Sequence, residues 1–230
     1  MKNRKSDVWA IIPAHNEAKN IGKVISESKK YVEKIVVVDD GSKDNTAEIA
    51  KKQGAIVLKH VVNLGKGSTL KTGCDFVYKA CAKNKNNKKI KIILIDADGQ
   101  HDPKLIPTFI KKLENKEIIF GARDFNKKMP LVLRVGNNFI NFIIELLFQV
   151  KVRDSQSGYR AFWLKNYRKI RWRAQDYSME SEMIANVGKH KLKYGQVSIP
   201  TVYNDNYKGT TIVDGVRIVY NIFKWRVAKW

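Results

Sequence analysis

Two carboxylates one residue apart, Asp96 and Asp98, follow an apolar run at residues 92–95 and form the clearest chemical signal in the chain. Carboxylate oxygens are preferred ligands of hard divalent cations, and a pair at the end of a buried strand can hold a cation from one side. The remaining coordination positions then stay open for the phosphate oxygens of a ligand. Gln100 is a candidate third oxygen ligand.

An Asp-x-Asp sequence in a turn also commonly does no more than cap a helix. Here Asp102 and Pro103 follow, an N-cap with proline at the first helical position, so the context is strand, turn and helix. An EF-hand is excluded, because Pro107 stands where its loop requires a bidentate glutamate. The sequence therefore predicts an open cation site.

Other apolar runs also end in polar sequence, at residues 13–17 and 39–42. In parallel sheets, ligands bind outside the carboxyl ends of the strands, so these segments are expected to meet residues 96–98 in one crevice. Lys66, between two glycines, opens a helical stretch and suits a phosphate-facing turn. It is not a Walker loop, because His60 replaces the first glycine and Gly67 replaces the magnesium-binding Ser or Thr.

The elements that must position these residues alternate between strand and helix. Strand-like runs are predicted at residues 8–12, 35–38, 55–58, 90–95 and 118–120, separated by segments of helix length. This alternation predicts an α/β, Rossmann-like fold with a mostly parallel sheet flanked by helices. At 230 residues, with no linker or repeat, the chain suits a single domain.

The charge balance indicates an anionic partner. Lys and Arg number 44 against 22 acidic residues, a net +22, which suits a phosphorylated substrate, membrane headgroups or nucleic acid. Nucleic acid is not favoured, because the lysine-rich run at 83–89 lacks interleaved aromatic residues. Cys74 and Cys81 are spaced about 10 Å apart on a helix, beyond disulfide reach, and are expected to be core residues in a reducing cytosol.

The amino terminus resembles no secretory signal, and the apolar stretch at 139–150 is too short and polar to span a bilayer. Residues 131–150 are amphipathic. Residues 210–230 interleave apolar and basic side chains at helical spacing, a pattern typical of a membrane-surface helix. A helix that docks on its own domain explains the same pattern equally well.

Six ordered motifs together resemble the family 2 glycosyltransferases of GT-A fold, and among them the polyprenyl-phosphate (dolichyl-phosphate) sugar synthases. The similarity covers about residues 8–205, and its motifs lie at residues 12–17, 37–42, 63–67, 96–100, 121–123 and 157–162. The resemblance implies a nucleotide-sugar half at 1–123, an acceptor half at 124–209 and the amphipathic segment at 210–230. It further implies an inverting transfer from a UDP- or GDP-sugar to polyprenyl phosphate, supplying lipid-linked sugar for glycan or protein glycosylation.

On the donor side, the resemblance implies that Pro13, Glu17 and Asp39 hold the base and ribose, with Asp40 supporting their loop. Asp96, Asp98 and Gln100 would hold Mg²⁺ or Mn²⁺ against the diphosphate. The full set expected to bind the nucleotide sugar is Pro13, Ala14, Glu17, Asp39, Asp40, Lys66, Gly67, Asp96, Ala97 and Asp98.

On the acceptor side, the resemblance implies that Arg123 and Arg134 face the acceptor phosphate or the transferring sugar. Asp154, Ser157 and Arg160 look like a structural motif below that site, with a buried Arg160–Asp154 ion pair as the alternative. Lys208 stands near the place where mannose-transferring relatives carry an arginine, which leaves the donor sugar open. The acceptor-side set is Arg123, Arg134, Asn138, Ser157, Arg160 and Lys208, and the catalytic set is Asp98, Arg123, Arg134 and Lys208.

A phosphate acceptor is already an anion and needs alignment rather than a general base. An acceptor hydroxyl would need a carboxylate, for which Glu180 and Glu182 are candidates. A nucleotidyltransferase would show a glycine-rich signature at 13–17, and a non-catalytic binding module would not need the metal pair. The sequence thus favours the lipid-phosphate enzyme, peripheral on the cytoplasmic face of the membrane.

Overall fold

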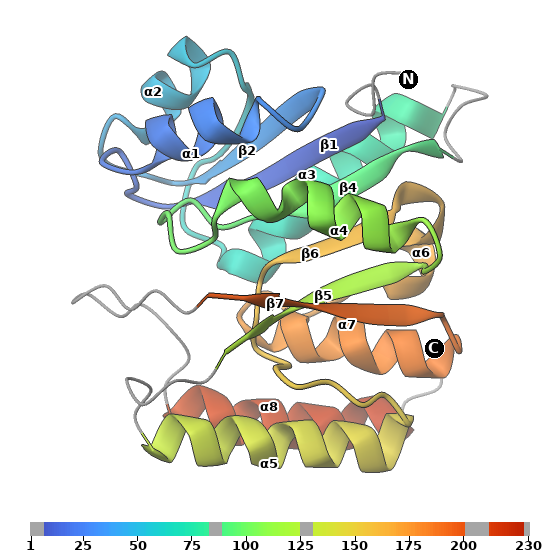
Figure 1. Cartoon of the computed structure of the whole chain (residues 1–230). Helices are drawn as coiled ribbons and strands as arrows, with labels where there is room; N and C mark the ends of the chain where they lie inside the picture. The colour runs from blue at the N-terminus through green and yellow to red at the C-terminus, as the bar shows by residue number, and fades with distance from the viewer. Residues whose placement is uncertain (1–6, 83–88, 125–130, 201–211, 228–230) are drawn as a thin grey trace.

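The computed structural model describes residues 7–82, 89–124, 131–200 and 212–227. Its centre is a seven-stranded sheet in the order β3-β2-β1-β4-β6-β5-β7 (Figure 1). The strands are β1 (Val8–Ala14), β2 (Lys34–Asp40), β3 (Ile56–His60), β4 (Lys91–Leu94), β5 (Ile118–Arg123), β6 (Arg160–Trp163) and β7 (Tyr194–Ile199).

The sheet is mostly parallel, which confirms the predicted fold class. The exception is β6, which runs antiparallel to both β4 and β5 between them. The five predicted strands are present with boundaries shifted by up to three residues, whereas no strand was predicted at β6 or β7. Because β6 separates β4 from β5, it sets the distance between the Asp96 turn and the end of β5.

Two hydrophobic cores lie on the two faces of the sheet. Along β1, Trp9 and Ile11 belong to one core, and Ala10 and Ile12 to the other, as expected for a buried strand. The helices are α1 (Ile21–Ser28), α2 (Thr46–Lys52), α3 (Lys66–Ala82), α4 (Ile106–Leu113), α5 (Leu131–Phe148), α6 (Tyr167–Ile170), α7 (Ser178–Lys189) and α8 (Ile212–Val227), with 3₁₀ turns at Pro103–Leu105 and Leu164–Asn166.

Cys74 and Cys81 are free thiols with buried side chains, which confirms the prediction that they are core residues. They lie on α3, which packs against β1 and β2. Asp102 caps the first 3₁₀ turn by accepting from the Lys104 amide at 2.9 Å, and Pro103 opens that turn as expected.

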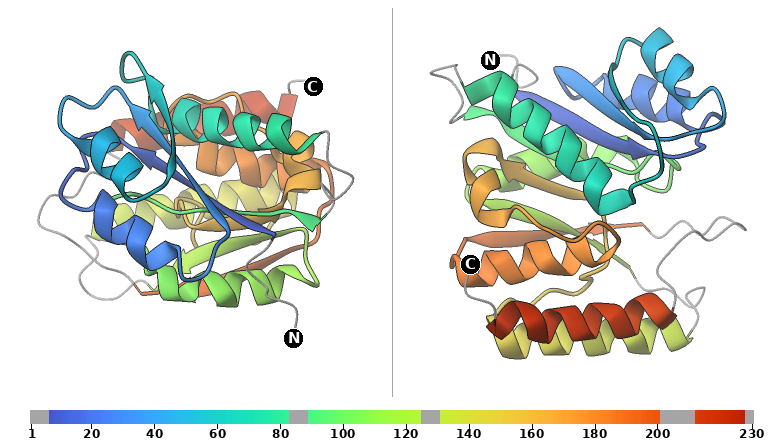
Figure 2. Two further views of the ribbon diagram at one scale, coloured as in Figure 1. Left: turned by 90° about the horizontal axis from the view of Figure 1, so that it is seen from above. Right: turned by 180° about the vertical axis from the view of Figure 1, so that it is seen from behind.

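The outermost layer consists of α5 and α8, which lie side by side beyond α7 (Figures 1 and 2). Ile218, Ile222 and Trp225 bury one face of α8 in the same core as α5 and α7. The carboxyl-terminal helix therefore docks on its own domain. Within the described residues, every helix is too short or too polar to cross a membrane.

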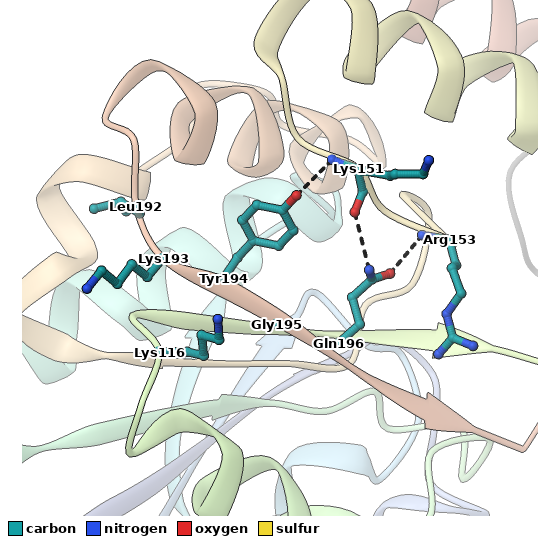
Figure 3. Close-up of a pocket in the computed structure, with 8 residues that line it drawn as sticks. All are labelled: Lys116, Lys151, Arg153, Leu192, Lys193, Tyr194, Gly195 and Gln196. Carbon is teal, nitrogen blue, oxygen red and sulfur yellow. Dashed lines mark hydrogen bonds between the residues drawn. The ribbon is translucent and has the colours of Figure 1, made fainter.

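The sheet edge at β7 is covered by the segment that follows α5. The Tyr194 hydroxyl accepts from the Lys151 amide at 2.9 Å, and the Gln196 side chain accepts from the Arg153 amide at 2.7 Å (Figure 3). These contacts occupy hydrogen-bonding groups beside an otherwise open edge strand. The lysine-lined recess around them lies at the amino ends of β5 and β7, away from the carboxyl-end crevice.

Candidate active site

A tight turn after β4 presents the two carboxylates at the carboxyl end of the sheet. The Gln100 amide donates to Asp98 Oδ1 at 2.9 Å, and the Asp96 amide donates to His101 Nδ1 at 3.2 Å. Gly99 has φ +79°, a backbone conformation that side chains rarely adopt. Ala97, between the carboxylates, is buried. The turn therefore holds Asp96 and Asp98 on the same short loop.

Lys66, the first residue of α3, joins this turn to α7. Its Nζ lies 3.0 Å from Asp96 and 3.1 Å from Glu180 Oε1. Burial by itself lowers the pKa of Lys66, but the two carboxylates outweigh it and hold that pKa above its ordinary value. A Cβ on Gly158 would lie 2.7 Å from Lys66 Nζ and 3.0 Å from Asp96 Oδ2, so a larger residue there would push against this ion pair.

The two aspartates have opposite electrostatic environments. Burial raises the pKa of Asp98 to about 6, and the neighbouring charge of Asp96 adds to the shift. Burial by itself raises the pKa of Asp96. The opposing effects of Lys66 and His101 are larger, so the net shift of this pKa is downward. His101 has its pKa lowered to about 4 by burial, so this side chain is neutral at pH 7.

The Asp96 turn fits a hard divalent cation. Two carboxylates lie on one loop, and their oxygens are the kind of ligand that such a cation prefers. Among the described residues, Asp, Glu, His and Cys side chains do not gather in groups of three or more that could enclose a metal. An open cation site at this turn stays a prediction, and Gln100 lies on the same turn.

The end of β2 contributes two aspartates with different surroundings. Asp40 accepts from the Leu64 and Gly65 amides, both at 2.9 Å, and bonds His60 at 2.7 Å, so it supports the loop before α3. Asp39 Oδ1 accepts from the Ser42 amide at 3.0 Å. Asp39 Oδ2 is buried without a hydrogen bond to any described residue, with Lys59 Nζ at 3.8 Å. An unpaired buried acceptor of this kind suits a ligand hydroxyl or N–H.

The loop after β1 is fixed against the loop after β2. The Glu17 amide donates to Thr46 Oγ1 at 2.8 Å, and Asn16 adopts φ +54°. Pro13 and Ala14 end β1 directly beside Val38 and Asp39. The three donor-side segments thus come together at one end of the sheet.

Gly67 packs against protein. A Cβ there would lie 2.3 Å from the Ala174 carbonyl oxygen, and its own carbonyl accepts from Trp172 Nε1 at 2.8 Å. A contact between Gly67 and the nucleotide sugar stays a prediction.

On the acceptor side, Arg123 ends β5 and binds Asp154. Arg123 Nε lies 2.6 Å from Asp154 Oδ2, and a second guanidinium nitrogen lies 3.1 Å from Oδ1. The alternative that Asp154 pairs with Arg160 is therefore wrong. Arg160 is almost fully buried and donates instead to the carbonyls of Ser155, Ser157 and Glu180 at 2.7–3.0 Å.

This arrangement corrects Arg160 as an acceptor-side contact. Burial lowers the pKa of Arg160 to about 10, so the guanidinium stays charged at pH 7, and its donors are used by backbone carbonyls. Arg160 is thus structural, in agreement with the motif that the resemblance implies. Ser157 is buried beside Gly121 and Tyr159 and belongs to the same packing.

Three further acceptor-side candidates have different positions. Arg134 is half-buried near the start of α5. Asn138 is exposed, whereas Asn137 and Asn141 are buried, and Asn141 donates to the Arg153 carbonyl and accepts from the Ser155 amide. The inward positions therefore lie one residue before and three residues after the predicted one. Lys208 lies outside the described residues.

The two glutamates considered as general bases are both buried on α7. Glu182 accepts from the Arg173 and Ala174 amides at 2.8–3.0 Å, so it holds the segment before α7 and is not a free base. Burial raises the pKa of Glu180, opposed by Lys66 and Arg160. The Lys66–Glu180 contact was not expected, because nothing local in the sequence links residues so far apart. His101 belongs to the same short motif as Asp96, but its contact with the Asp96 amide was not predicted.

The chain belongs to glycosyl transferase family 2, whose sequence model matches residues 9–182. It is therefore a glycosyltransferase, and the predicted hexosyltransferase class is confirmed. Family membership overturns the alternatives of a nucleotidyltransferase and of a binding module without turnover.

Among similar proteins, an uncharacterized protein of Methanocaldococcus jannaschii is 40% identical, over 97% of this chain and 93% of that protein. The UDP-N-acetylglucosamine–dolichyl-phosphate N-acetylglucosaminyltransferase of Methanococcus voltae is 36% identical, over 96% and 97% of the two chains. A dolichyl-phosphate beta-glucosyltransferase of Trichomonas vaginalis is 27% identical, over 82% of this chain and 64% of that protein.

Solved structures confirm the fold. Glucosyl-3-phosphoglycerate synthase from Mycobacterium tuberculosis superposes with a TM-score of 0.73 at 17% identity, covering 97% of this chain and 81% of that one. A complex of the same enzyme with Mn²⁺, UDP and glucosyl-3-phosphoglycerate gives 0.67 at 18% identity, covering 95% and 77%.

Proposed function

We propose that this enzyme transfers a sugar from a nucleoside diphosphate sugar to a polyprenyl phosphate, with inversion at the anomeric carbon. The observation that carries the proposal is the cluster at the carboxyl end of β4, where Asp96 and Asp98 share one turn and Lys66 contacts Asp96. The Methanococcus voltae relative is named for UDP-N-acetylglucosamine and dolichyl phosphate, which favours UDP over GDP as the donor nucleotide and a dolichyl phosphate as the acceptor.

On the donor side, Asp39 would accept from the base or ribose through its unpaired Oδ2, with Glu17 and Pro13 closing the same pocket. Asp96, Asp98 and Gln100 would hold Mg²⁺ or Mn²⁺, which when bound neutralises the leaving diphosphate. Lys66 would supply a second positive charge beside that diphosphate at the amino end of α3. Its bond to Glu180 keeps it in place when Asp96 takes up the cation.

On the acceptor side, Arg123 and Arg134 would bind the phosphate of the acceptor. Asp154 fixes the Arg123 guanidinium with two hydrogen bonds, which sets the orientation of the guanidinium plane. A phosphate anion attacks without losing a proton, so alignment is the main requirement. An acceptor hydroxyl would need a carboxylate free to take its proton. Glu182 is bound to backbone amides and Glu180 is buried in an ion pair with Lys66, which favours the phosphate acceptor.

The expected place of action is the surface of a membrane on its cytoplasmic face, because the isoprenoid part of such an acceptor stays in the bilayer. The product would be a lipid-linked sugar that serves later glycosylation steps.

The test is a transfer assay with purified protein, radiolabelled UDP- and GDP-sugars, a short polyprenyl phosphate, and Mg²⁺ or Mn²⁺. The expected result is label in the organic phase that requires both the metal and the phosphate. Label transferred only to water-soluble acceptors bearing a hydroxyl would overturn the acceptor assignment, and transfer unaffected by chelation would overturn the metal assignment.

A further inference from the structure

Each of the two outer helices exposes a stripe of large apolar side chains. On α5 the stripe is Val135, Phe139, Phe142 and Leu146. On α8 it is Val216, Tyr220, Phe223 and Val227. Each of these eight side chains is between 53% and 83% exposed. On both helices the steps are four, three and four residues, which places each set on a single helix face.

Both stripes lie opposite the buried faces of their helices. Ile140 and Ile144 of α5, and Ile218 and Ile222 of α8, are buried in the core that α7 shares. Because α5 and α8 lie side by side as the outermost layer, the stripes combine into one apolar surface directed away from the domain (Figures 1 and 2). We call these eight residues the outer helical face. Contiguous exposed apolar surface of this kind marks an interaction site.

Charges beside the outer helical face indicate what it contacts. Exposed Lys224 and Arg226 lie on opposite sides of the α8 stripe, each about 80° from it on a helical wheel of about 100° per residue. An apolar stripe flanked by cations is the pattern of a helix that lies in the plane of an anionic membrane surface. A second copy of the chain fits poorly, since a two-fold interface would bring these cations together in a protein of net charge +22.

We propose that α5 and α8 together dock the enzyme on an anionic lipid bilayer. The outer helical face enters the boundary between headgroups and acyl chains, and Lys224 and Arg226 meet lipid phosphates. The inference deepens the proposed function, because an acceptor with an isoprenoid chain must be reached at a bilayer. Docking itself needs neither donor nor acceptor, so the two ideas can fail separately.

The inner side of α5 connects this surface to the acceptor side of the site. Asn141 donates to the Arg153 carbonyl at 2.9 Å and accepts from the Ser155 amide at 3.0 Å. The residue between them, Asp154, holds Arg123. One helix therefore contacts the bilayer with its outer side and supports the arginine site with its inner side, so a lipid phosphate could approach Arg123 from the membrane.

The test is flotation of the full chain with vesicles that contain no acceptor, made of phosphatidylcholine alone or with about one third phosphatidylglycerol. We expect the protein to float with the anionic vesicles. The variant F139S/F142S/F223S removes three aromatic side chains of the outer helical face and should lower the partition coefficient about tenfold or more. The control I56S/V61S removes exposed apolar side chains near β3 and should bind like the wild type.

Two further measurements separate the outcomes. K224Q/R226Q should keep weak binding to neutral vesicles and lose most of the anionic preference. Transfer to a short, water-soluble prenyl phosphate should be unchanged in F139S/F142S/F223S, since these residues do not line the crevice. If F139S/F142S/F223S binds vesicles as well as the wild type, the inference is overturned. It is also overturned if sedimentation shows that the wild type is a dimer and that this variant is a monomer. A wild-type protein that binds the vesicles but transfers no sugar to the prenyl phosphate would instead overturn the proposed function.

Discussion

The donor and acceptor sides of this enzyme have opposite charge and are built differently. Carboxylates follow β1, β2 and β4 on the donor side, whereas the acceptor side presents arginine at the end of β5. The first arrangement suits a ligand that arrives with a cation, and the second suits a ligand that is itself an anion. The contrast therefore supports the proposed transfer from a metal-bound diphosphate to a phosphate.

The two sides also differ in how they hold their side chains. Asp98 and Asp39 accept from amides two or three residues away, so short turns fix them. Arg123 is held by Asp154, which is distant in sequence, and Arg160 binds Glu180 on α7 in addition to the nearby Ser155 and Ser157 carbonyls. Substitutions on the donor side should therefore affect chemistry, and those on the acceptor side should affect chemistry and folding together.

The largest effect is expected for Asp98→Ala, which should lower the transfer rate about 10³-fold or more because the cation loses a ligand. The fold should remain, since burial already raises the pKa of this carboxyl and its removal relieves that cost. The rate is measured with saturating donor, and stability by thermal unfolding.

Asp102→Ala is the matched control for that variant. Asp102 caps the 3₁₀ turn four residues further on, so its loss should cost about 1 kcal/mol of stability and leave the rate nearly unchanged. Retained transfer in Asp98→Ala with metal still bound would contradict the assignment of Asp98.

Arg160→Met should be the most destabilising substitution on the acceptor side. It leaves three carbonyl groups in a buried site without their donor, which we expect to cost about 3 kcal/mol in the free energy of unfolding. Urea unfolding measures the change. The exposed Arg168→Met, which loses only a cation–π contact with Tyr78, should cost about 0.5 kcal/mol. Equal costs for the two variants would show that Arg160 is not a structural support.

Arg123→Gln should separate acceptor from donor binding. We expect kcat/KM for the acceptor to fall about 30-fold, roughly 2 kcal/mol, while the affinity for UDP stays within about twofold. Asp154→Asn should have a similar effect, because it removes the group that orients Arg123, and the double variant should be little worse than either single one. Weakened UDP binding with an unchanged acceptor KM would place Arg123 on the donor side instead.

The smallest effect is expected for a substitution at Asp75, which joins the two halves of the chain. Asp75 on α3 binds Arg171 and the Tyr167 hydroxyl, at 2.7 Å in each case. Burial raises the pKa of Asp75, but these hydrogen bonds outweigh it and lower that pKa below its ordinary value. The contact therefore stabilises the fold above the unfolded pKa of about 4 and is lost as pH falls through the lower folded pKa.

Asp75→Asn should thus cost about 1 kcal/mol at pH 7, a modest value because Arg171 is partly exposed. The difference from wild type should shrink below about pH 4, measured by urea unfolding at both pH values. A difference that grows on acidification would have the wrong sign and would refute the contact as a source of stability.

Much of the donor side could be predicted from sequence. Period and composition locate five strands, and the position of Asp39, Asp40, Asp96 and Asp98 directly after two of them places these residues at one edge of the sheet. Even the different roles of Asp39 and Asp40 agree with the geometry, since Asp40 supports a loop and Asp39 keeps an oxygen unpaired.

The acceptor side could not be predicted to the same depth. Asp154 was open to pairing with Arg160 and instead binds Arg123, and Asn138 was chosen where Asn137 and Asn141 are the buried asparagines. Both errors involve partners separated in sequence, which depend on the antiparallel insertion of β6 and on the packing of α5.

The sequence by itself determined the fold class, the family and the acidic edge, because strand period and strand-end motifs are local properties. Only the tertiary structure decided that Lys66 connects Asp96 with Glu180, that Asp154 holds Arg123, and that α5 and α8 present one apolar surface. These pairings depend on how distant elements pack, and a one-residue change in helix phase or strand register would alter each of them.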